Sequence, residues 1–147
     1  NALMRLCVAY LKDTALAEDA VQETFVKAYK AMDTFRGDSS EKTWLTRIAI
    51  NTCRSIRRDR WFRFVDRRVA PDALPLKTAS EEDRALMEVV MNLPCRYKEA
   101  VLLYYYQGLT MEETAETLGV AASTISTRLK KARQKLRLDL EGGHNDV

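Results

Sequence analysis

Two short basic blocks in this 147-residue chain hold the residues best suited to binding chemistry. The first, residues 54–68, holds seven arginines against Asp59 and Asp66. The second, residues 128–137, holds six basic residues and no acidic one. The net charge is only +3, so the clustering rather than the total indicates a polyanionic partner. The alternative at this point is two helix faces that are merely solvated.

Side chains that would support catalysis or metal binding are scarce. The one histidine, His144, lies in a polar end, and Cys7, Cys53 and Cys95 are far apart with no C-x-x-C pair. No zinc site, phosphate loop or nucleophile–base pair can be assembled from them. We therefore expect no enzyme, no metal, no cofactor and no small-molecule substrate. We expect the cysteines to act as small apolar residues in a reducing cytoplasm, with a redox role for one of them as the alternative.

The chain shows no sign of membrane insertion, because it has no apolar run of about 18 residues. It shows no secretory signal, and its first residue is Asn rather than Met, so the sequence leaves open whether its N-terminus is truncated. Apolar residues recur with helical periodicity throughout, and strand signals are nearly absent. The predicted fold class is all-α, with two small helical domains. We expect a first domain over residues 1–64, a linker over 65–80, a second domain over 81–141 and a polar tail over 142–147.

The first domain is predicted to hold a short helix over Ala2–Leu11 and a longer one over residues 16–35. The longer helix carries two stripes of side chains. The core stripe is predicted to be Ala17, Val21, Phe25, Ala28 and Met32. The second is Gln22, Val26, Tyr29 and Asp33, flanked by Asp19 and Glu23. That second stripe is either packed on a helix of the same domain or is a docking surface edged with acid.

A third helix is predicted after the loop at residues 36–40, with Asp38 and Glu41 as a capping box. Its core face is predicted to be Leu45, Ile48, Ala49, Thr52 and Ile56. Trp44 borders that face and is predicted to be a core residue, with a ligand contact as the alternative. On the opposite side Arg47, Asn51, Arg54 and Arg58 fall on one line. Aromatic residues Trp61, Phe62 and Phe64 follow. A line of Arg and Asn followed by aromatic residues is typical of a surface that binds phosphates and stacks bases.

The second domain is predicted to begin with helices over residues 84–93 and 97–107, joined at Pro94. Tyr104, Tyr105 and Tyr106 are predicted to pack and to make contact between the domains, with base stacking as the alternative. A helix-turn-helix follows: Thr110 and Glu113 form a capping box, and Gly119 provides the turn. The inward residues are predicted to be Met111, Ala115, Leu118, Ile125, Leu129, Ala132, Leu136 and Leu140. Ser123, Thr124, Thr127, Arg128 and Lys131 project outward, which suits a recognition helix in a DNA major groove.

Two long segments resemble the extracytoplasmic-function (ECF, group IV) sigma factors of bacterial RNA polymerase, in the sigma-70 family. AEDAVQETFVKAYKAMDTFRGDSSEKTWLTRIAINTCRSIRR is similar to region 2, and LPCRYKEAVLLYYYQGLTMEETAETLGVAASTISTRLKKAR is similar to region 4. The order of the two motifs, with a linker between them, is specific to this family. An initial helix that is usual in the family is not matched.

The resemblance implies a role for each surface. Core RNA polymerase is expected to bind Asp19, Gln22, Glu23, Val26 and Tyr29. The −10 DNA is expected to meet Phe35, Arg36, Asp38, Ser39, Arg47, Asn51, Arg54 and Arg58, with one flipped base captured near Phe35, the loop and Asn51. The −35 element is expected at Ser123, Thr124, Ser126, Thr127, Arg128 and Lys131.

The resemblance also implies how the protein works and with which partners. It is expected to be a cytoplasmic initiation factor that binds core polymerase and promoter DNA, and to be held inactive by an anti-sigma factor, which is commonly anchored in the membrane. Housekeeping sigma factors open DNA with a Trp pair, but Arg47 and Ile48 stand at those positions, which predicts narrow promoter choice. The alternative is a stand-alone helix-turn-helix regulator, which would leave the docking stripe of the first domain without a purpose.

Overall fold

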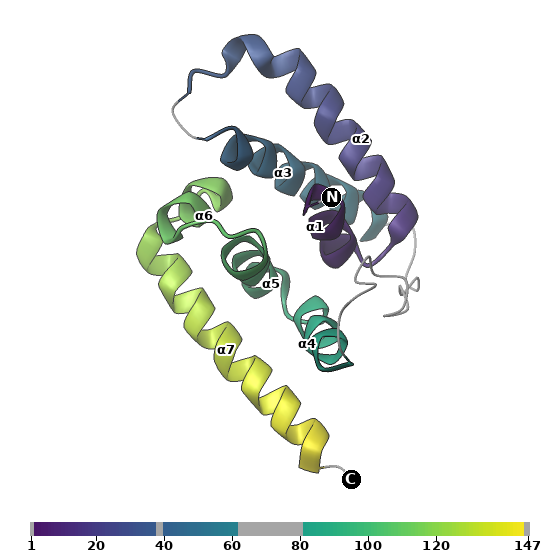
Figure 1. Ribbon diagram of the computed structural model, residues 1–147, viewed down its shortest axis with the longest axis vertical. Coiled ribbons are helices and arrows are strands. Elements are labelled where there is room, and N and C mark those ends of the chain that lie inside the picture. The colour runs from purple at the N-terminus through teal and green to yellow at the C-terminus, as the bar shows by residue number, and fades with distance from the viewer. Residues whose placement is uncertain (1, 38–39, 62–80, 146–147) are drawn as a thin grey trace. The chain divides into compact units, whose positions relative to one another are not determined.

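The computed structural model describes residues 2–37, 40–61 and 81–145, and every regular element in these ranges is a helix. The chain divides into two compact units, Asn1–Leu74 and Pro75–Val147 (Figure 1). The predicted all-α class with two helical domains is thus confirmed. The expected linker and the aromatic residues Phe62 and Phe64 lie outside the described residues.

The first unit is a bundle of three helices that pack against one another: α1 (Ala2–Leu11), α2 (Thr14–Ala31) and α3 (Glu41–Trp61), with a short 3₁₀ turn, η1 (Met32–Thr34), after α2 (Figure 1). Asp13 starts α2, because its carboxylate accepts a hydrogen bond from the backbone N–H of Leu16 at 3.0 Å. Leu6, Tyr10 and Ile50 are among the largest fully buried side chains. Arg57 of α3 lies over the Tyr10 ring, 5.9 Å from its centre.

The core face of α2 differs from the prediction. Its buried residues are Ala17, Ala20, Thr24 and Ala28, whereas Phe25 and Met32 are exposed. Small residues spaced by three and four let α2 approach its neighbours closely, and the Thr24 hydroxyl is satisfied by donating to the Ala20 carbonyl at 2.7 Å. Ala17 and Ala28 are thus buried as predicted, but the centre of the buried face lies about one-sixth of a turn from the predicted one, on the side of the small residues.

The buried face of α3 is likewise more polar than predicted. Ala49 and Thr52 are buried as expected, but Leu45, Ile48 and Ile56 are only partly covered, while Thr43, Thr46, Ile50 and Cys53 are buried. The predicted capping residue Asp38 lies outside the described residues. Instead, Ser40 directly precedes the helix, and its hydroxyl oxygen accepts a hydrogen bond from the Thr43 backbone N–H at 3.1 Å.

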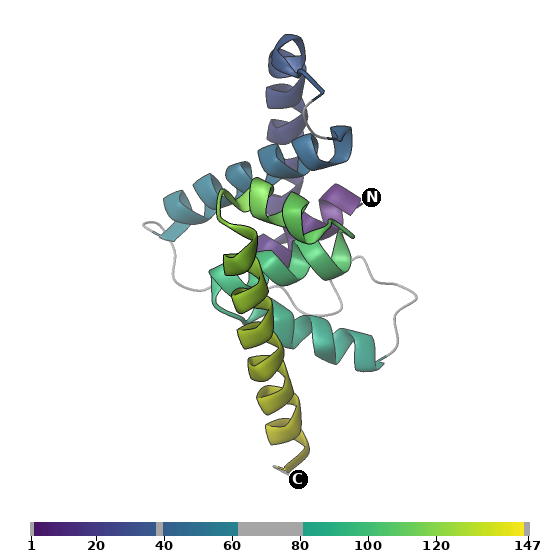
Figure 2. The same ribbon diagram turned by 90° about the vertical axis from the view of Figure 1, so that its left-hand side faces the viewer.

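The second unit contains α4 (Glu81–Met91), α5 (Cys95–Val101), a π-helical turn η3 (Leu102–Tyr106), α6 (Met111–Leu118) and α7 (Ala122–Asn145). α7 is a long helix that packs on α4, α5 and α6 (Figure 2). Ile125, Leu129 and Ala132 are buried as predicted, Leu136 is partly covered, and the Leu140 side chain lies outside the described part. The helix continues to Asn145, through most of the segment expected to be a polar tail.

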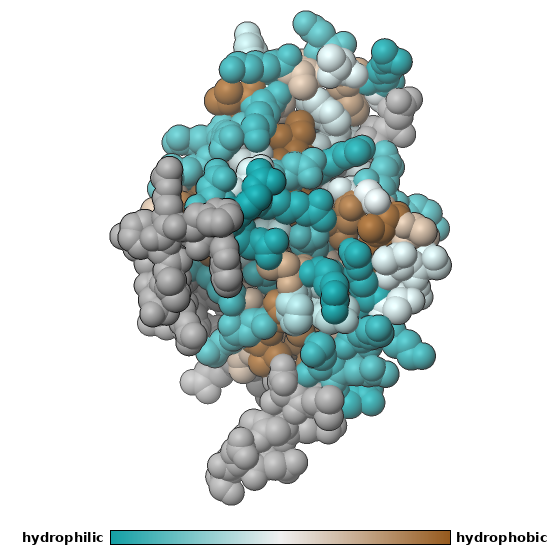
Figure 3. Space-filling model, turned by 180° about the vertical axis from the view of Figure 1, so that it is seen from behind, coloured by the Kyte–Doolittle hydropathy of each residue, from teal (hydrophilic) through white to brown (hydrophobic). Residues whose placement is uncertain are grey.

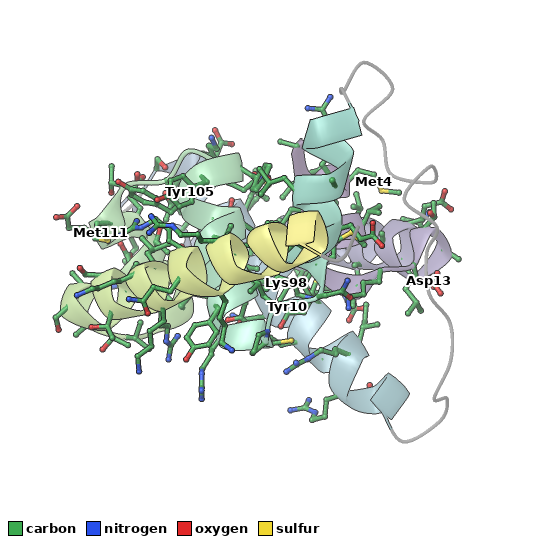
Figure 4. The ribbon with its side chains drawn as sticks, turned by 90° about the horizontal axis from the view of Figure 1, so that it is seen from below. Met4, Tyr10, Asp13, Lys98, Tyr105 and Met111 are labelled. Atoms are coloured by element: carbon green, nitrogen blue, oxygen red, sulfur yellow. The ribbon has the colours of Figure 1, made fainter. Side chains whose placement is uncertain are left out.

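The three consecutive tyrosines do not pack as predicted. Tyr105 and Tyr106 are exposed, and only Tyr104 is partly covered. They lie in the π-helical turn η3, which ends with the Gln107 N–H donating to the Leu102 carbonyl at 2.9 Å. Tyr105 accepts a hydrogen bond from Arg133 of α7 at 2.7 Å. Figure 4 shows Tyr105 and Met111 toward the same end of this unit.

Candidate nucleic-acid and protein interfaces

The helix-turn-helix geometry in the second unit is set by a capped first helix and a left-handed turn. Thr110 accepts a hydrogen bond from the Glu113 N–H at 3.0 Å, and Glu113 accepts one from the Thr110 N–H at 2.9 Å, which completes the predicted capping box. Gly119 follows the last residue of α6 and has a φ of 72°. This left-handed backbone conformation is strained for residues with a Cβ atom but not for glycine. The predicted turn is confirmed, and α7 begins at Ala122, which has no side-chain cap before it because Ala121 precedes it.

The exposed side of α7 forms one wall of a groove, and the first turn of α5 forms the other. Ser123, Thr127 and Lys131 are exposed, and Thr124 and Arg128 are half-buried. All five were predicted to project outward, and all five line this groove. Many nitrogen-tipped side chains project from the unit around α7 (Figure 4). Short hydroxyl residues near the start of a helix, followed by Arg and Lys, can reach base edges and phosphates in a major groove.

Three residues near this groove depart from the sequence-based assignment. Ser126 is exposed but does not line the groove. Arg96 and Tyr97 do line it, although the sequence analysis assigned them no role. The hydrogen bond from Arg96 lowers the pKa of the Tyr97 phenol, and the positive charges of Arg96, Lys131 and Lys135 act in the same direction. A signal was available in the sequence, since a basic and an aromatic residue directly follow the Pro-Cys start of α5.

The predicted line on α3 is a solvent-facing basic surface. Arg47, Asn51 and Arg58 are exposed and Arg54 is half-buried, and at the helical repeat they share the side of α3 opposite the buried Ala49, Thr52 and Cys53. A guanidinium row with an amide among its members can bind successive phosphates and hydrogen-bond a base edge. Trp61 ends α3, but its side chain lies outside the described part.

An aromatic pair stands beside the start of α3. The rings of Phe35 and Trp44 lie 4.8 Å apart at their centres, with their planes tilted by 38°. Both side chains are half-buried, and neighbouring Arg36 is exposed. Trp44 thus packs against Phe35 at the edge of the domain, and its assignment as a core residue rather than a ligand stays a prediction. Asp38 and Ser39, predicted to belong to the same site, lie outside the described residues.

The outer face of α2 is both apolar and exposed. Val26 is 51% and Tyr29 79% exposed, and Asp19, Gln22, Glu23 and Asp33 are exposed around them. The alternative that this stripe packs on a helix of the same domain is therefore wrong. Phe25 and Met32 add two exposed apolar side chains at 48% and 61%. Figure 3, in which α2 occupies the upper part, shows brown side chains among teal ones.

One of the acidic side chains on the outer face of α2, Glu23, forms an ion pair. Lys27 forms an ion pair with Glu23 at 3.2 Å and donates a hydrogen bond to Thr52 of α3 at 3.2 Å. Because the pair is largely exposed, its contribution to stability is small. The hydrogen bond to Thr52 links Lys27 to α3, and the apolar side chains Phe25, Val26, Tyr29 and Met32 of α2 remain exposed.

Among the described residues, no group of His, Cys, Asp or Glu side chains is placed to hold a metal ion. The three cysteines are free thiols, and Cys7 and Cys53 are buried next to each other. The hydrogen bond with Cys53 lowers the pKa of Cys7. No helix within the described ranges is long and apolar enough to cross a membrane.

Comparisons with known proteins agree with the two-unit division. The family model described as Sigma-70 region 2 matches residues 1–63, and the one described as Sigma-70, region 4 matches residues 83–136. The RNA polymerase sigma-H factor of Pseudomonas aeruginosa is 33% identical over 92% of this chain and 79% of its own length. The ECF RNA polymerase sigma factor SigW of Bacillus subtilis is 29% identical over 95% of this chain and 83% of its own length.

Solved structures show the same fold. The sigma factor RpoE in complex with the anti-sigma factor NepR, from Bartonella quintana, superposes with a TM-score of 0.83 at 28% identity, covering 95% of this chain and 90% of that one. CnrH in complex with the cytosolic domain of CnrY superposes with a TM-score of 0.73 at 27% identity, covering 96% and 81%. Two family models in order, relatives over nearly the whole chain and a shared fold lead to one conclusion: the chain belongs to the ECF group of the sigma-70 family.

Proposed function

We propose that this protein is an alternative sigma factor that binds core RNA polymerase and directs it to promoters by recognising −35 and −10 elements. The observation that carries the proposal is that the two helical units together expose three surfaces of different character. These surfaces are the groove at α7, the basic line on α3 and the apolar face of α2. The polymerase performs the chemistry, and the sigma factor contributes binding energy and orientation.

The −35 element is assigned to α7. Ser123, Thr124, Thr127, Arg128 and Lys131 border one groove, so they can enter a major groove together. Ser126 remains part of the proposed −35 surface, but from the side of α7 away from this groove. A bidentate contact from Arg128 to guanine would contribute about 1–3 kcal/mol of discrimination.

The −10 element is assigned to α3 and the segment before it. Arg47, Arg54 and Arg58 would hold phosphates, and Asn51 would hydrogen-bond a base. The supported Phe35 ring, with Arg36, Asp38 and Ser39, would form the wall of a pocket for an extruded base. Unstacking a base costs a few kcal/mol, which such a pocket offsets by stacking and hydrogen bonding. With Arg47 and Ile48 in place of a Trp pair, melting depends more strongly on promoter sequence.

Core polymerase is assigned to α2. Asp19, Gln22, Glu23, Val26 and Tyr29 form an exposed face with apolar residues inside and acidic residues at the edge, which is the usual arrangement of a protein interface. An anti-sigma factor is the proposed regulator, because the similar sigma factor RpoE is in complex with the anti-sigma factor NepR. We propose a cytoplasmic location, with membrane retention only through that partner.

The decisive experiment is run-off transcription with sigma-free core polymerase and a promoter library. Wild-type protein should produce transcripts from a narrow set of promoters that share −35 and −10 elements. The isolated protein should bind these promoters weakly until core polymerase is added. A stand-alone regulator would instead bind its operator tightly without polymerase and would start no transcripts, and that result would overturn the proposal.

A further inference from the structure

Two thiols of the first unit lie buried against each other, and none of the proposed surfaces uses them. Cys7 lies on α1 and Cys53 on α3, two helices that pack together, and neither residue has exposed surface. Their side chains are joined by a hydrogen bond. Because the two residues are far apart in the sequence, only the packing of α1 on α3 brings the sulfur atoms together. Two thiols in contact meet the first requirement for a disulfide.

The neighbouring positions on both helices are buried and largely apolar, among them Leu6, Ala49 and Ile50. A sulfenic or sulfinic acid is polar or charged, and burying such a group in an apolar core is costly. A disulfide carries no charge and has no hydrogen to donate. Of the oxidation products open to these thiols, the disulfide is therefore the one that this core accommodates best.

The hydrogen bond also distinguishes the two thiols. It lowers the pKa of Cys7 in spite of burial, which by itself would raise that pKa. The thiolate rather than the thiol is the nucleophile in reactions with peroxides and disulfides. Cys7 is thus suited to react first, with Cys53 next to it to react second. Disulfides in a reducing compartment are usually transient bonds of this kind rather than structural ones.

We propose that Cys7 and Cys53 form a redox site, in which a hydroperoxide oxidises the two thiols to a disulfide between α1 and α3. The Cys7 thiolate attacks one peroxide oxygen, the O–O bond breaks, and the leaving hydroxide takes up a proton to give water. Cys53 then attacks the sulfur of the Cys7 sulfenic acid, the S–O bond breaks, and the second oxygen leaves as water with the Cys53 proton. The two thiols lose two electrons, and hydrogen peroxide gains them.

The disulfide would fasten α1 to α3 within the packed first unit. α3 carries the proposed −10 surface and packs on α2, which carries the proposed polymerase-binding face. A cross-link between residues distant in sequence restricts the unfolded chain, so oxidation should stabilise this unit. A thiol reductant should reverse the effect, because thiol–disulfide exchange opens the bond. Since both thiols are buried, the oxidant reaches them only when the helices separate briefly, and the reaction should be slower than at an exposed thiol.

The test uses the full chain with Cys95→Ala, which removes the third thiol, in the second unit, and keeps the pair. Cys7→Ala and Cys53→Ala in the same background are matched controls, because each leaves one thiol without its partner. The folded, reduced proteins are treated with hydrogen peroxide, and catalase stops the reaction. Remaining thiols are blocked with N-ethylmaleimide in denaturant, and the intact mass is measured. Circular dichroism checks that each variant folds.

The Cys95→Ala protein should lose the mass of two hydrogen atoms and take up no maleimide, and dithiothreitol should restore both reactive thiols. Neither control should form an intramolecular disulfide. Hydrogen exchange of the amides around Cys7 should slow by about tenfold or more in the oxidised protein, because the cross-link opposes opening of α1. Exchange in α6, which belongs to the other unit, should stay unchanged.

Three results would overturn the inference. The Cys95→Ala protein could keep both thiols or gain oxygen atoms in place of a disulfide, the disulfide could form only after unfolding in urea, or exchange around Cys7 could be the same in both forms. Each would mean that the pair does no more than fill the core. The inference goes beyond the proposed function and is tested apart from it, because the thiol measurement needs neither polymerase nor DNA.

Discussion

Tyr29 on α2 is the residue whose substitution most directly tests the polymerase-binding face. The side chain is 79% exposed, so it contributes little to packing of the first unit. A tyrosine buries about 150 Å² or more when it is covered. Covering its exposed part at about 25 cal/mol per Å² corresponds to about 3 kcal/mol as an upper value, and alanine would retain part of that. We expect Tyr29→Ala to weaken core binding by about 2 kcal/mol, or about 30-fold.

The measurement is the dissociation constant of the sigma–core complex, by surface plasmon resonance or anisotropy with labelled protein. The thermal midpoint of Tyr29→Ala should stay within the change expected for surface substitutions, about 0.5 kcal/mol in the free energy of unfolding. Lys30→Ala is the matched control, because Lys30 is the exposed neighbour outside the proposed interface. An unchanged dissociation constant for Tyr29→Ala, with a normally folded variant, would refute the reasoning from exposed apolar area.

Three further predictions test the DNA-binding surface of α7, the turn at Gly119 and the cap of α6. Arg128→Ala or Lys131→Ala should weaken promoter recognition by about 1–3 kcal/mol if the residue reads a base, while core binding in a pull-down stays normal; loss of core binding would contradict the assignment. Gly119→Ala should lower the free energy of unfolding by about 1 kcal/mol in a urea titration, because φ of 72° disfavours alanine while no atom lies within 4 Å of the added Cβ; an unchanged midpoint would mean that the turn relaxes. Thr110→Ala should cost about 1 kcal/mol in the same titration by removing the cap of α6, with Thr110→Ser close to wild type; equal losses for both would argue against the capping bond.

The proposed DNA-binding surfaces lie on both units, whereas the proposed polymerase-binding face lies on α2. Basic surfaces are present on both, which would let one protein contact two separated DNA elements. The exposed apolar face on α2 belongs to the first unit alone. We propose that polymerase bound at this face holds both DNA contacts in place, and we expect the isolated protein to bind promoters weakly for that reason.

Much of this protein follows from local sequence signals. Helical periodicity predicted the all-α class, and the capping box at Thr110 and the turn at Gly119 predicted the helix-turn-helix, because caps and left-handed turns depend on residues close in sequence. The same is true of the Arg and Asn line on α3. A fixed helical repeat puts Arg47, Asn51 and Arg58 on one side whatever the helix packs against.

Tertiary structure decided which faces are covered and which distant residues meet. Periodicity cannot distinguish two apolar stripes on one helix, so only the packing of α2 showed that Ala20 and Thr24 are buried and that Phe25 and Met32 are exposed. Likewise, only the crossing of α5 and α7 brings Arg96 and Tyr97 beside Lys131, more than 30 residues away in the chain. The burial of a side chain and the contacts between residues distant in the sequence depend on how whole helices pack together. No single segment of the sequence specifies that packing by itself.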